Sequence, residues 1–158
     1  MVSEFRSLCE EKNLSISYKN SATSSLTEAD EYTVNQIFQN LIGNAVKYTP
    51  NGYVKILLED EGDDELIVSI KDSGIGISKN YLRNIFKPFS QEDVGQKREF
   101  EGNGLGLALV KKYVDLNSAT IAVQSKKNKG SVFSVKFKKF VNNAGEKEET
   151  NTLTENRS

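Results

Sequence analysis

Three polar side chains recur at helical spacing in the segment that covers residues 34–48. Asn40, Asn44 and Lys47 stand four and three residues apart, which places them on one face of a helix beside an apolar stripe. Asparagine is a mediocre helix former, because its amide competes for local backbone hydrogen bonds. Its oxygen is a hard, neutral ligand for Mg²⁺, and lysine offers a point charge to phosphate. Two alternatives stay open here: a solvated helix face, and a face that binds phosphate and metal.

Glycines gather in the middle of the chain, where six of the eleven lie between positions 74 and 106. Gly74 and Gly76 follow an apolar run that ends at Asp72. A second group, within residues 102–106, opens a helical pattern, and free backbone N–H groups at a helix start bind phosphate. Neither group fits the dinucleotide fingerprint or the Walker pattern. A tight turn would explain one group alone, whereas the two together favour a ligand site.

The composition excludes several kinds of site and partner. The 158 residues contain no histidine, which removes histidine metal sites and triads built on an imidazole base. The single cysteine, Cys9, excludes an internal disulfide framework. The net charge of −1 lacks the excess of positive charge that is typical of nucleic-acid-binding domains. No apolar run approaches the ~18 residues that a membrane span needs. We expect no nucleic-acid partner, no membrane contact by this chain and a cytoplasmic location, with a membrane anchor elsewhere in the full-length protein left open.

Alternating strands and helices must position these groups. The apolar pattern predicts strands over about residues 14–18, 53–58, 66–70, 120–124 and 132–137. It predicts helices from the capping residues 27–30 to Thr49, over 78–86 and over 105–116, and the residues after Phe5 have the pattern of the end of a connecting helix. The prediction is an α/β fold whose mixed sheet is covered on one face by helices.

Two segments carry no such pattern. Residues 87–103 are polar and mixed in charge, so we expect a loop that is mobile without ligand. All aromatic residues lie at or before Phe140, and residues 141–158 have almost nothing to bury. We therefore expect one domain over residues 1–140, followed by a disordered tail or linker over 141–158.

Four segments, taken together, resemble the ATP-binding catalytic domain of sensor histidine kinases, a member of the gyrase–Hsp90–histidine kinase–MutL superfamily. The N box is matched by residues 40–50, the first glycine box by 72–77, the F box by 85–89 and the second glycine box by 102–110. Their order and spacing agree with the family over about residues 4–140. Residues 89–93, with Arg98, are similar to kinases found in hybrid sensors.

This resemblance implies a two-layer α/β sandwich, the Bergerat fold, with a mixed sheet of about five strands backed by three helices. It implies ATP and Mg²⁺ as cofactors. Asp72 would accept from the adenine amino group, Asn44 would hold Mg²⁺, and Asn40 and Lys47 would act in catalysis. Lys47 and Tyr48 would face the phosphates or ribose. The remaining nucleotide-binding positions implied are Gly74, Gly76, Ile77, Phe89, Arg98, Gly102, Gly104, Leu105, Gly106, Leu107 and Ser131.

The implied activity is transfer of the γ-phosphoryl group of ATP to a histidine. Because the chain has none, the acceptor would lie on a separate dimerisation domain, expected in the same dimeric full-length protein, with a response regulator downstream. Two alternatives remain, a nucleotide-binding regulatory module without kinase activity and a conformational ATPase. The ATPases of this superfamily carry a Glu at the position of Asn40, and an amide is no general base.

The chain departs from the family pattern at two places. Asn103 stands where Thr or Ser is usual, so this position offers an amide in place of a hydroxyl. Residues 117–119 replace a usual His-Gly-Gly-like turn, so we expect the connection there to differ from the family pattern.

Overall fold

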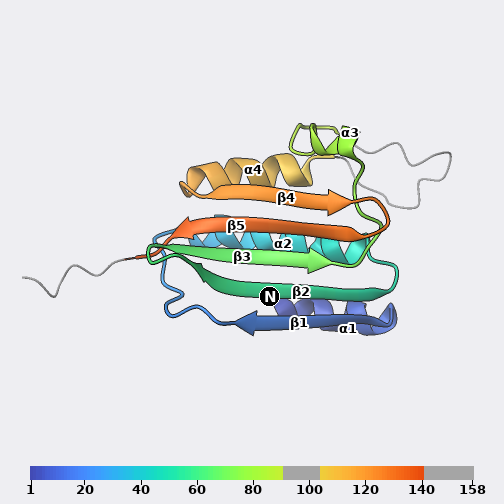
Figure 1. The fold of residues 1–158 in the computed structure, drawn as a ribbon, viewed down its shortest axis with the longest axis horizontal. Helices are drawn as coiled ribbons and strands as arrows, with labels where there is room; N and C mark the ends of the chain where they lie inside the picture. The colour runs from blue at the N-terminus through green and yellow to red at the C-terminus, as the bar shows by residue number, and fades with distance from the viewer. Residues whose placement is uncertain (91–103, 141–158) are drawn as a thin grey trace, which may run out of the picture.

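The computed structural model describes residues 1–90 and 104–140, and shows one five-stranded sheet with helices against it (Figure 1). The strand order is β1-β2-β3-β5-β4. In chain order the elements are α1 (Val2–Glu11), β1 (Leu14–Asn20), α2 (Glu31–Lys47), β2 (Gly52–Glu61), β3 (Glu65–Asp72), α3 (Lys79–Leu82), α4 (Gly106–Leu116), β4 (Thr120–Lys126) and β5 (Gly130–Lys138).

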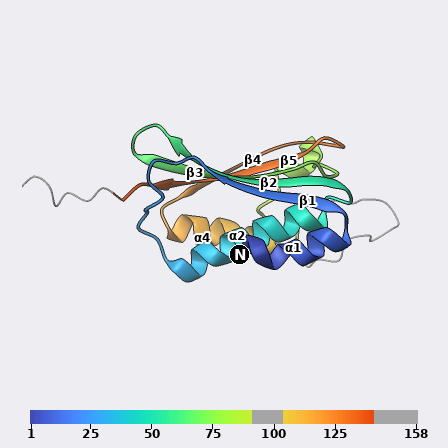
Figure 2. The ribbon, with the colours of Figure 1, turned by 90° about the horizontal axis from the view of Figure 1, so that it is seen from below.

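The sheet is mixed, as the sequence predicted. β1 pairs with β2 in parallel, whereas β2–β3, β3–β5 and β4–β5 are antiparallel. Seen along the sheet, α1, α2 and α4 lie on one of its faces (Figure 2). The two-layer α/β fold class is therefore confirmed. No helix in the described part of the chain is long and apolar enough to cross a membrane.

Helix α2 is the central element of the core. The Asp30 side chain caps it by accepting a hydrogen bond from the Thr33 backbone N–H at 2.8 Å, in the place where the sequence predicted a cap. Its apolar stripe is buried against the sheet, and the polar positions fall on the neighbouring face. The buried residues of α2 are Ile37, Phe38, Leu41, Ile42, Ala45 and Val46.

The strands alternate between this core and the open face of the sheet, because successive side chains point to opposite sides. In the central rows, Ile56 of β2 is paired with Ile70 of β3, which is paired in turn with Phe133 of β5. All three side chains are buried. The same alternation brings Asp72, the last residue of β3, onto the core face, opposite Ser131.

One predicted helix is shorter than expected. The pattern over 78–86 predicted a single helix, but α3 ends at Leu82 and the chain continues in turns. The backbone N–H of Asn84 bonds to Tyr81, and that of Lys87 bonds to Asn84, three residues back in each case. Pro88 lies directly ahead, and the residue before a proline is disfavoured in a helix. These turns, and no longer a helix, place the side chain of Ile85 in the core.

Residues 117–119, which depart from the family pattern, form a C-terminal cap on α4. The Ala119 N–H bonds to the Val114 carbonyl and the Ser118 N–H to that of Asp115, both at 3.0 Å, which is the Schellman arrangement. Ser118 takes the left-handed conformation, with φ of 50°, where glycine is usual. Of the other predictions, the tail at 141–158 and most of the loop, residues 91–103, lie outside the described residues.

Candidate functional site

Most of the predicted site residues that the structure describes come together at one end of the sheet. The C-terminal end of α2, the loop after β3 and the β4–β5 hairpin all lie at this end, on the right in Figure 1. The Ile75 N–H bonds to the Tyr48 carbonyl at 3.1 Å, and the Asn128 N–H bonds to the Ile75 carbonyl at 2.7 Å. The first glycine loop is therefore held between the end of α2 and the β4–β5 hairpin.

Asp72 is the carboxylate at the centre of this end. Asp72 is only 7% exposed, and its Oδ1 accepts a hydrogen bond from the Gly74 N–H at 2.9 Å. Burial raises the pKa of Asp72 above its ordinary value, while hydrogen bonds from the backbone N–H groups of Gly74 and Ser131 act in the opposite direction. Within residues 1–90 and 104–140, no lysine or arginine forms an ion pair with it. A buried carboxylate served by neutral donors alone can still accept a hydrogen bond from a ligand.

The loop that follows Asp72 fits its place only because it contains glycine. A Cβ on Gly74 would lie 2.2 Å from the Tyr48 carbonyl oxygen and 2.8 Å from Thr49 Oγ1. Gly76 has a φ of 64°, and a Cβ there would lie 2.0 Å from the Lys126 carbonyl oxygen. In both cases the nearest atom is a backbone oxygen, which cannot move aside as the end of a flexible side chain does. The close packing on both sides explains why the two glycines are needed.

The predicted polar face of α2 meets the start of α4. Asn40 Nδ2 donates to the Gln36 carbonyl at 2.8 Å, and its Oδ1 would lie 3.0 Å from a Cβ on Gly106, the first residue of α4. The N box and the second glycine box therefore touch in the folded chain. A helix N-terminus with a glycine at its first position leaves backbone N–H groups accessible to an anion.

Asn44 lies one turn further along α2 and is half-buried. In the part of the chain that the structure describes, its side-chain amide has no hydrogen-bond partner. Among the same residues, no group of three or more His, Cys, Asp or Glu could hold a metal. One neutral amide oxygen without a partner fits Mg²⁺, which commonly takes few protein ligands and fills its shell with phosphate and water.

Lys47 and Tyr48 end the helix together. The Lys47 Nζ lies 5.3 Å from the centre of the Tyr48 ring, at cation–π distance. Burial raises the pKa of the Tyr48 hydroxyl, with a smaller contribution from Tyr81. Lys12, which the sequence reasoning missed, donates from the end of α1 to the Val46 carbonyl at 2.5 Å. A cation that caps the final carbonyls of α2 fixes the end of this helix.

The F box and the second glycine box are adjacent. The Phe89 N–H bonds to the Gly104 carbonyl at 3.0 Å, and both residues have left-handed backbones, with φ of 59° and 70°. The Phe89 side chain is 76% exposed, Leu105 is 38% exposed, and Leu107 packs against the core. Ile77 packs against the same core. Arg98, Gly102 and Asn103 lie outside the described residues.

Ser131 is buried beside Asp72, as its cross-strand pairing requires. Its Oγ lies 2.9 Å from the Oγ of Ser125, a residue that the sequence reasoning did not single out. Buried Thr49 was missed too, although it stands inside the N box, and its Oγ1 donates to the Ala45 carbonyl at 2.6 Å. Of these two residues, only Thr49 could have been found from the sequence, because a hydroxyl at a helix end can donate to the carbonyl four residues earlier.

A comparison with protein families finds a match over residues 29–140 to the model described as "Histidine kinase-, DNA gyrase B-, and HSP90-like ATPase". The chain belongs to this family. It is an ATP-binding domain of the kind found in histidine kinases, in agreement with the resemblance of its four boxes.

Curated relatives of this histidine kinase domain are much longer than the chain. It is 39% identical over 137 residues to the autoinducer 2 sensor kinase/phosphatase LuxQ of Vibrio parahaemolyticus, covering 83% of this chain and 16% of LuxQ. It is 44% identical to hybrid signal transduction histidine kinase L of Dictyostelium discoideum, over 68% of this chain and 7% of that protein. The chain thus corresponds to one small part of these hybrid and sensor kinases.

Solved structures agree with the fold of the domain. Full-length ShkA in complex with AMPPNP matches with a TM-score of 0.76 and 27% identity, over 86% of this chain and 28% of that one. The nucleotide-free catalytic domain of ThkA matches with a TM-score of 0.73 and 28% identity, over 87% of this chain and 88% of that one. ThkA has also been solved in complex with the response regulator TrrA, at a TM-score of 0.68 and 25% identity, over 87% of this chain and 38% of that one.

Proposed function

We propose that this domain binds ATP at the end of the sheet where Asp72 is buried, and that Asp72 recognises the adenine base. The observation that carries the proposal is the burial of this carboxylate with neutral backbone donors only, among the residues described. A carboxylate accepts hydrogen bonds and cannot donate them when ionised. It therefore suits the amino group of adenine and opposes the carbonyl that guanine carries at the same place.

The phosphates of the nucleotide would lie along the polar face of α2, toward the start of α4. Asn44 offers the amide oxygen for Mg²⁺, and Lys47 offers a cation at the end of the helix. Mg²⁺, when bound, supplies charge that neutralises the phosphate oxygens. The glycine at the first position of α4 lets an anion approach the backbone N–H groups there. Arg98 and Gly102 remain proposed contributors from the loop outside the described residues.

We further propose that the domain donates the γ-phosphoryl group to a histidine on a dimerisation domain. The chain has no histidine, so the acceptor must be supplied by another domain, which we place in the same dimeric full-length protein. Hybrid kinase L and LuxQ, which are far longer than this chain, support this arrangement. The ThkA complex supports a response regulator as the downstream partner.

Asn40 favours transfer over hydrolysis as the main activity. The ATPases of this superfamily use a carboxylate at this position to activate the attacking water. The amide of Asn40 already donates to the Gln36 carbonyl, and its oxygen faces the start of α4. An amide takes no proton from water at neutral pH, but it can orient an attacking group.

The test is phosphotransfer in trans. The domain is incubated with Mg²⁺, radiolabelled ATP and a dimerisation domain that bears the acceptor histidine, and acid-labile label on the acceptor is measured. We expect slow transfer, because separation of the domains removes the effective concentration that a tether provides, on the order of millimolar. Steady release of phosphate without acceptor would favour an ATPase. ATP binding without transfer at saturating acceptor would favour a regulatory module.

A further inference from the structure

The first glycine loop is attached to the β4–β5 hairpin through the hydroxyl of Ser125. The Ile77 backbone N–H donates to Ser125 Oγ at 2.8 Å. The same loop bonds to the hairpin a second time, through the Asn128 N–H and the Ile75 carbonyl at 2.7 Å. Gly76, between Ile75 and Ile77, packs against the Lys126 carbonyl. Ser125 is thus a side chain that joins the loop after Asp72 to the neighbouring hairpin.

The hydrogen bonds of Ser125 leave it no free donor. A serine hydroxyl has one proton and two lone pairs. Ser125 Oγ lies 2.9 Å from the Gly130 carbonyl oxygen, which can only accept, so the proton is directed there. Ser125 Oγ then accepts from Ile77 and from the Ser131 hydroxyl, which lies 2.9 Å away. All three bonding positions of the Ser125 hydroxyl are occupied.

This arrangement fixes the hydroxyl of Ser131. Because Ser125 has no second proton to give, Ser131 must be the donor between them, and its lone pairs are left for another group. Ser131 is buried and stands directly opposite Asp72 in the β3–β5 pairing. The side chain beside the proposed adenine-binding carboxylate is therefore presented as an acceptor.

We propose that Ser125 is a positioning residue for recognition of the nucleotide base. It touches neither base nor phosphate, and acts by holding the Ser131 hydroxyl as an acceptor and by fixing the loop that follows Asp72. The inference rests on the proposed function, because it needs adenine at Asp72. It goes beyond that function by assigning base selectivity to a residue outside the four boxes.

The sheet contains a matched control. Ser69 of β3 and Ser134 of β5 also place their hydroxyl oxygens 2.9 Å apart. They stand directly opposite each other, on the face of the sheet away from the helices. Ser134→Ala therefore removes a serine pair of the same kind and length from β5, without touching the glycine loop or Asp72.

The experiment is calorimetric titration of the whole chain, in Mg²⁺, with ATP and with purine riboside triphosphate, which lacks the 6-amino group. For Ser125→Ala we expect ATP affinity to fall about fivefold and the affinity for the purine analogue to change less than about twofold. The selectivity for the amino group therefore falls. Ser125→Thr, which keeps the hydroxyl, restores the selectivity, and Ser134→Ala leaves both affinities within about twofold of wild type.

Two results would overturn this inference while leaving the proposed function intact. One is wild-type ATP affinity and selectivity in Ser125→Ala. The other is an equal loss for both nucleotides together with a lower melting temperature, which is the signature of a merely structural serine. Failure of the unmodified chain to bind ATP would instead overturn the proposed function, and this inference with it.

Discussion

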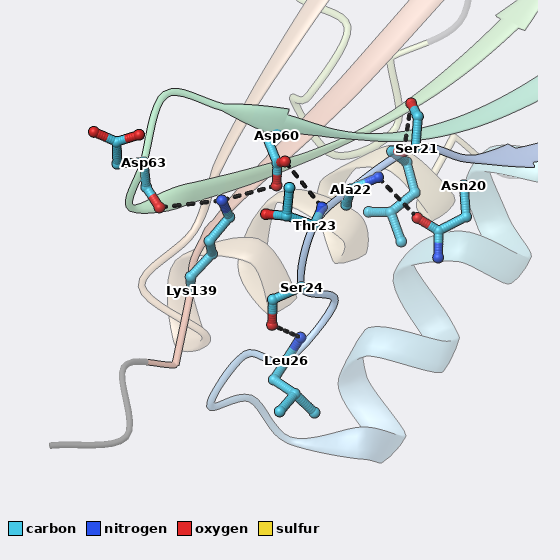
Figure 3. A network of polar contacts seen from close by, with 10 residues as sticks. Asn20, Ser21, Ala22, Thr23, Ser24, Leu26, Asp60, Asp63 and Lys139 are labelled. Carbon is cyan, nitrogen blue, oxygen red and sulfur yellow. Dashed lines mark hydrogen bonds and ion pairs between the residues drawn. The ribbon is translucent and has the colours of Figure 1, made fainter. Parts of the chain in front are cut away.

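Asp60 and Asp72 lie in the same β-hairpin, at opposite ends of the sheet, in contrasting environments. Asp60 Oδ1 lies 2.8 Å from the Nζ of Lys139, and its Oδ2 accepts from the Thr23 N–H at 2.9 Å (Figure 3). The close contact with the Lys139 ammonium, followed by the hydrogen bond from Thr23, lowers the pKa of Asp60. Asp72 has only backbone donors in the described ranges, and burial raises its pKa.

The difference separates a carboxylate that holds the fold from one that is available to a ligand. Lys139 also donates to the Asp63 carbonyl at 3.1 Å, so the Asp60 end ties the last strand, the β2–β3 turn and the segment before α2 together. At the Asp72 end, the negative charge is desolvated without a matching cation among the residues described. Perturbed carboxylates of this kind cluster at functional sites.

The largest expected effect on ATP affinity comes from replacing a glycine at the Asp72 end of the sheet, compared with one at the Asp60 end. Gly62, in the β2–β3 turn, and Gly76 have nearly the same φ, 65° and 64°. Nothing lies within 4 Å of a Cβ on Gly62, whereas one on Gly76 would meet the Lys126 backbone at 2.0 Å. We expect Gly76→Ala to displace the loop and to lower ATP affinity by up to about 100-fold, because relief of an overpacked contact costs typically about 1–3 kcal/mol.

Gly62→Ala is the matched control for the glycine comparison. We expect it to cost about 1–2 kcal/mol of stability, from its left-handed conformation alone, and to leave ATP affinity unchanged. Calorimetry measures the affinities and thermal unfolding the stabilities. An ATP affinity of Gly76→Ala within threefold of wild type would contradict the idea that the loop has no room to move.

Replacement of each aspartate by asparagine separates the role of Asp72 from that of Asp60. We expect Asp72→Asn to lower ATP affinity about 10–100-fold, because a hydrogen bond to a charged group contributes roughly 1.5–3 kcal/mol. Asp60→Asn should bind ATP as wild type does. Wild-type affinity should also fall as the pH is lowered through the raised pKa of Asp72, since the protonated carboxyl loses its charge. Calorimetric equality of Asp72→Asn and wild type would remove Asp72 from adenine recognition.

Two asparagines bridge α2 and α4 at opposite ends of the helix pair. Asn40 faces Gly106 at the start of α4, while Asn117, at the end of α4, accepts from the Asp30 N–H and donates to Thr33 Oγ1, each at 2.8 Å. We expect Asn40→Ala to lower phosphotransfer about tenfold more than ATP affinity, the pattern of a contact made only in the transition state.

The matched change, Asn117→Ala, should lower the free energy of unfolding by about 1–2 kcal/mol, because it removes hydrogen bonds that join the helices. It should leave the ratio of transfer rate to ATP affinity unchanged. Transfer assays and titrations on the same preparations give that ratio. Equal losses of transfer and binding in Asn40→Ala would make Asn40 an ordinary nucleotide ligand.

The smallest expected effect is the pH dependence of stability at the Asp60 end. Because the pKa of Asp60 is lower in the folded chain, its contribution is present above the ordinary aspartate pKa, about 3.9. That contribution is lost as the pH falls through the lowered value. Asp60→Asn should therefore melt below wild type at pH 7, and the two melting curves should converge in acid. A difference that persists unchanged at low pH would mean that the ion pair with Lys139 does not contribute.

The family and the order of the elements could be predicted from the sequence because they depend on local patterns. The four boxes are contiguous runs, and the side-chain periods of 3.6 and 2 place residues on a helix or strand face without knowledge of the partner. The Asp30 cap, the apolar stripe of α2 and the polar face with Asn40 and Asn44 are of this kind. The early end of α3 was missed, because turns within 83–87 and the burial of Ile85 outweigh the local pattern.

Local sequence patterns suffice to place Asp72 at the end of a strand, to place glycines after it, and to put Asn40 and Asn44 on one helix face. Which of these groups have partners depends on the tertiary structure. The contact between Ile77 and Ser125 spans 48 residues, and that between Thr23 and Asp60 spans 37. Such contacts depend on strand register and on the packing of α2 against the sheet, which no local period specifies. Asp60 and Asp72 are both acidic residues near strand ends, and tertiary contacts gave Asp60 a lysine while leaving Asp72, among the residues described, with backbone donors.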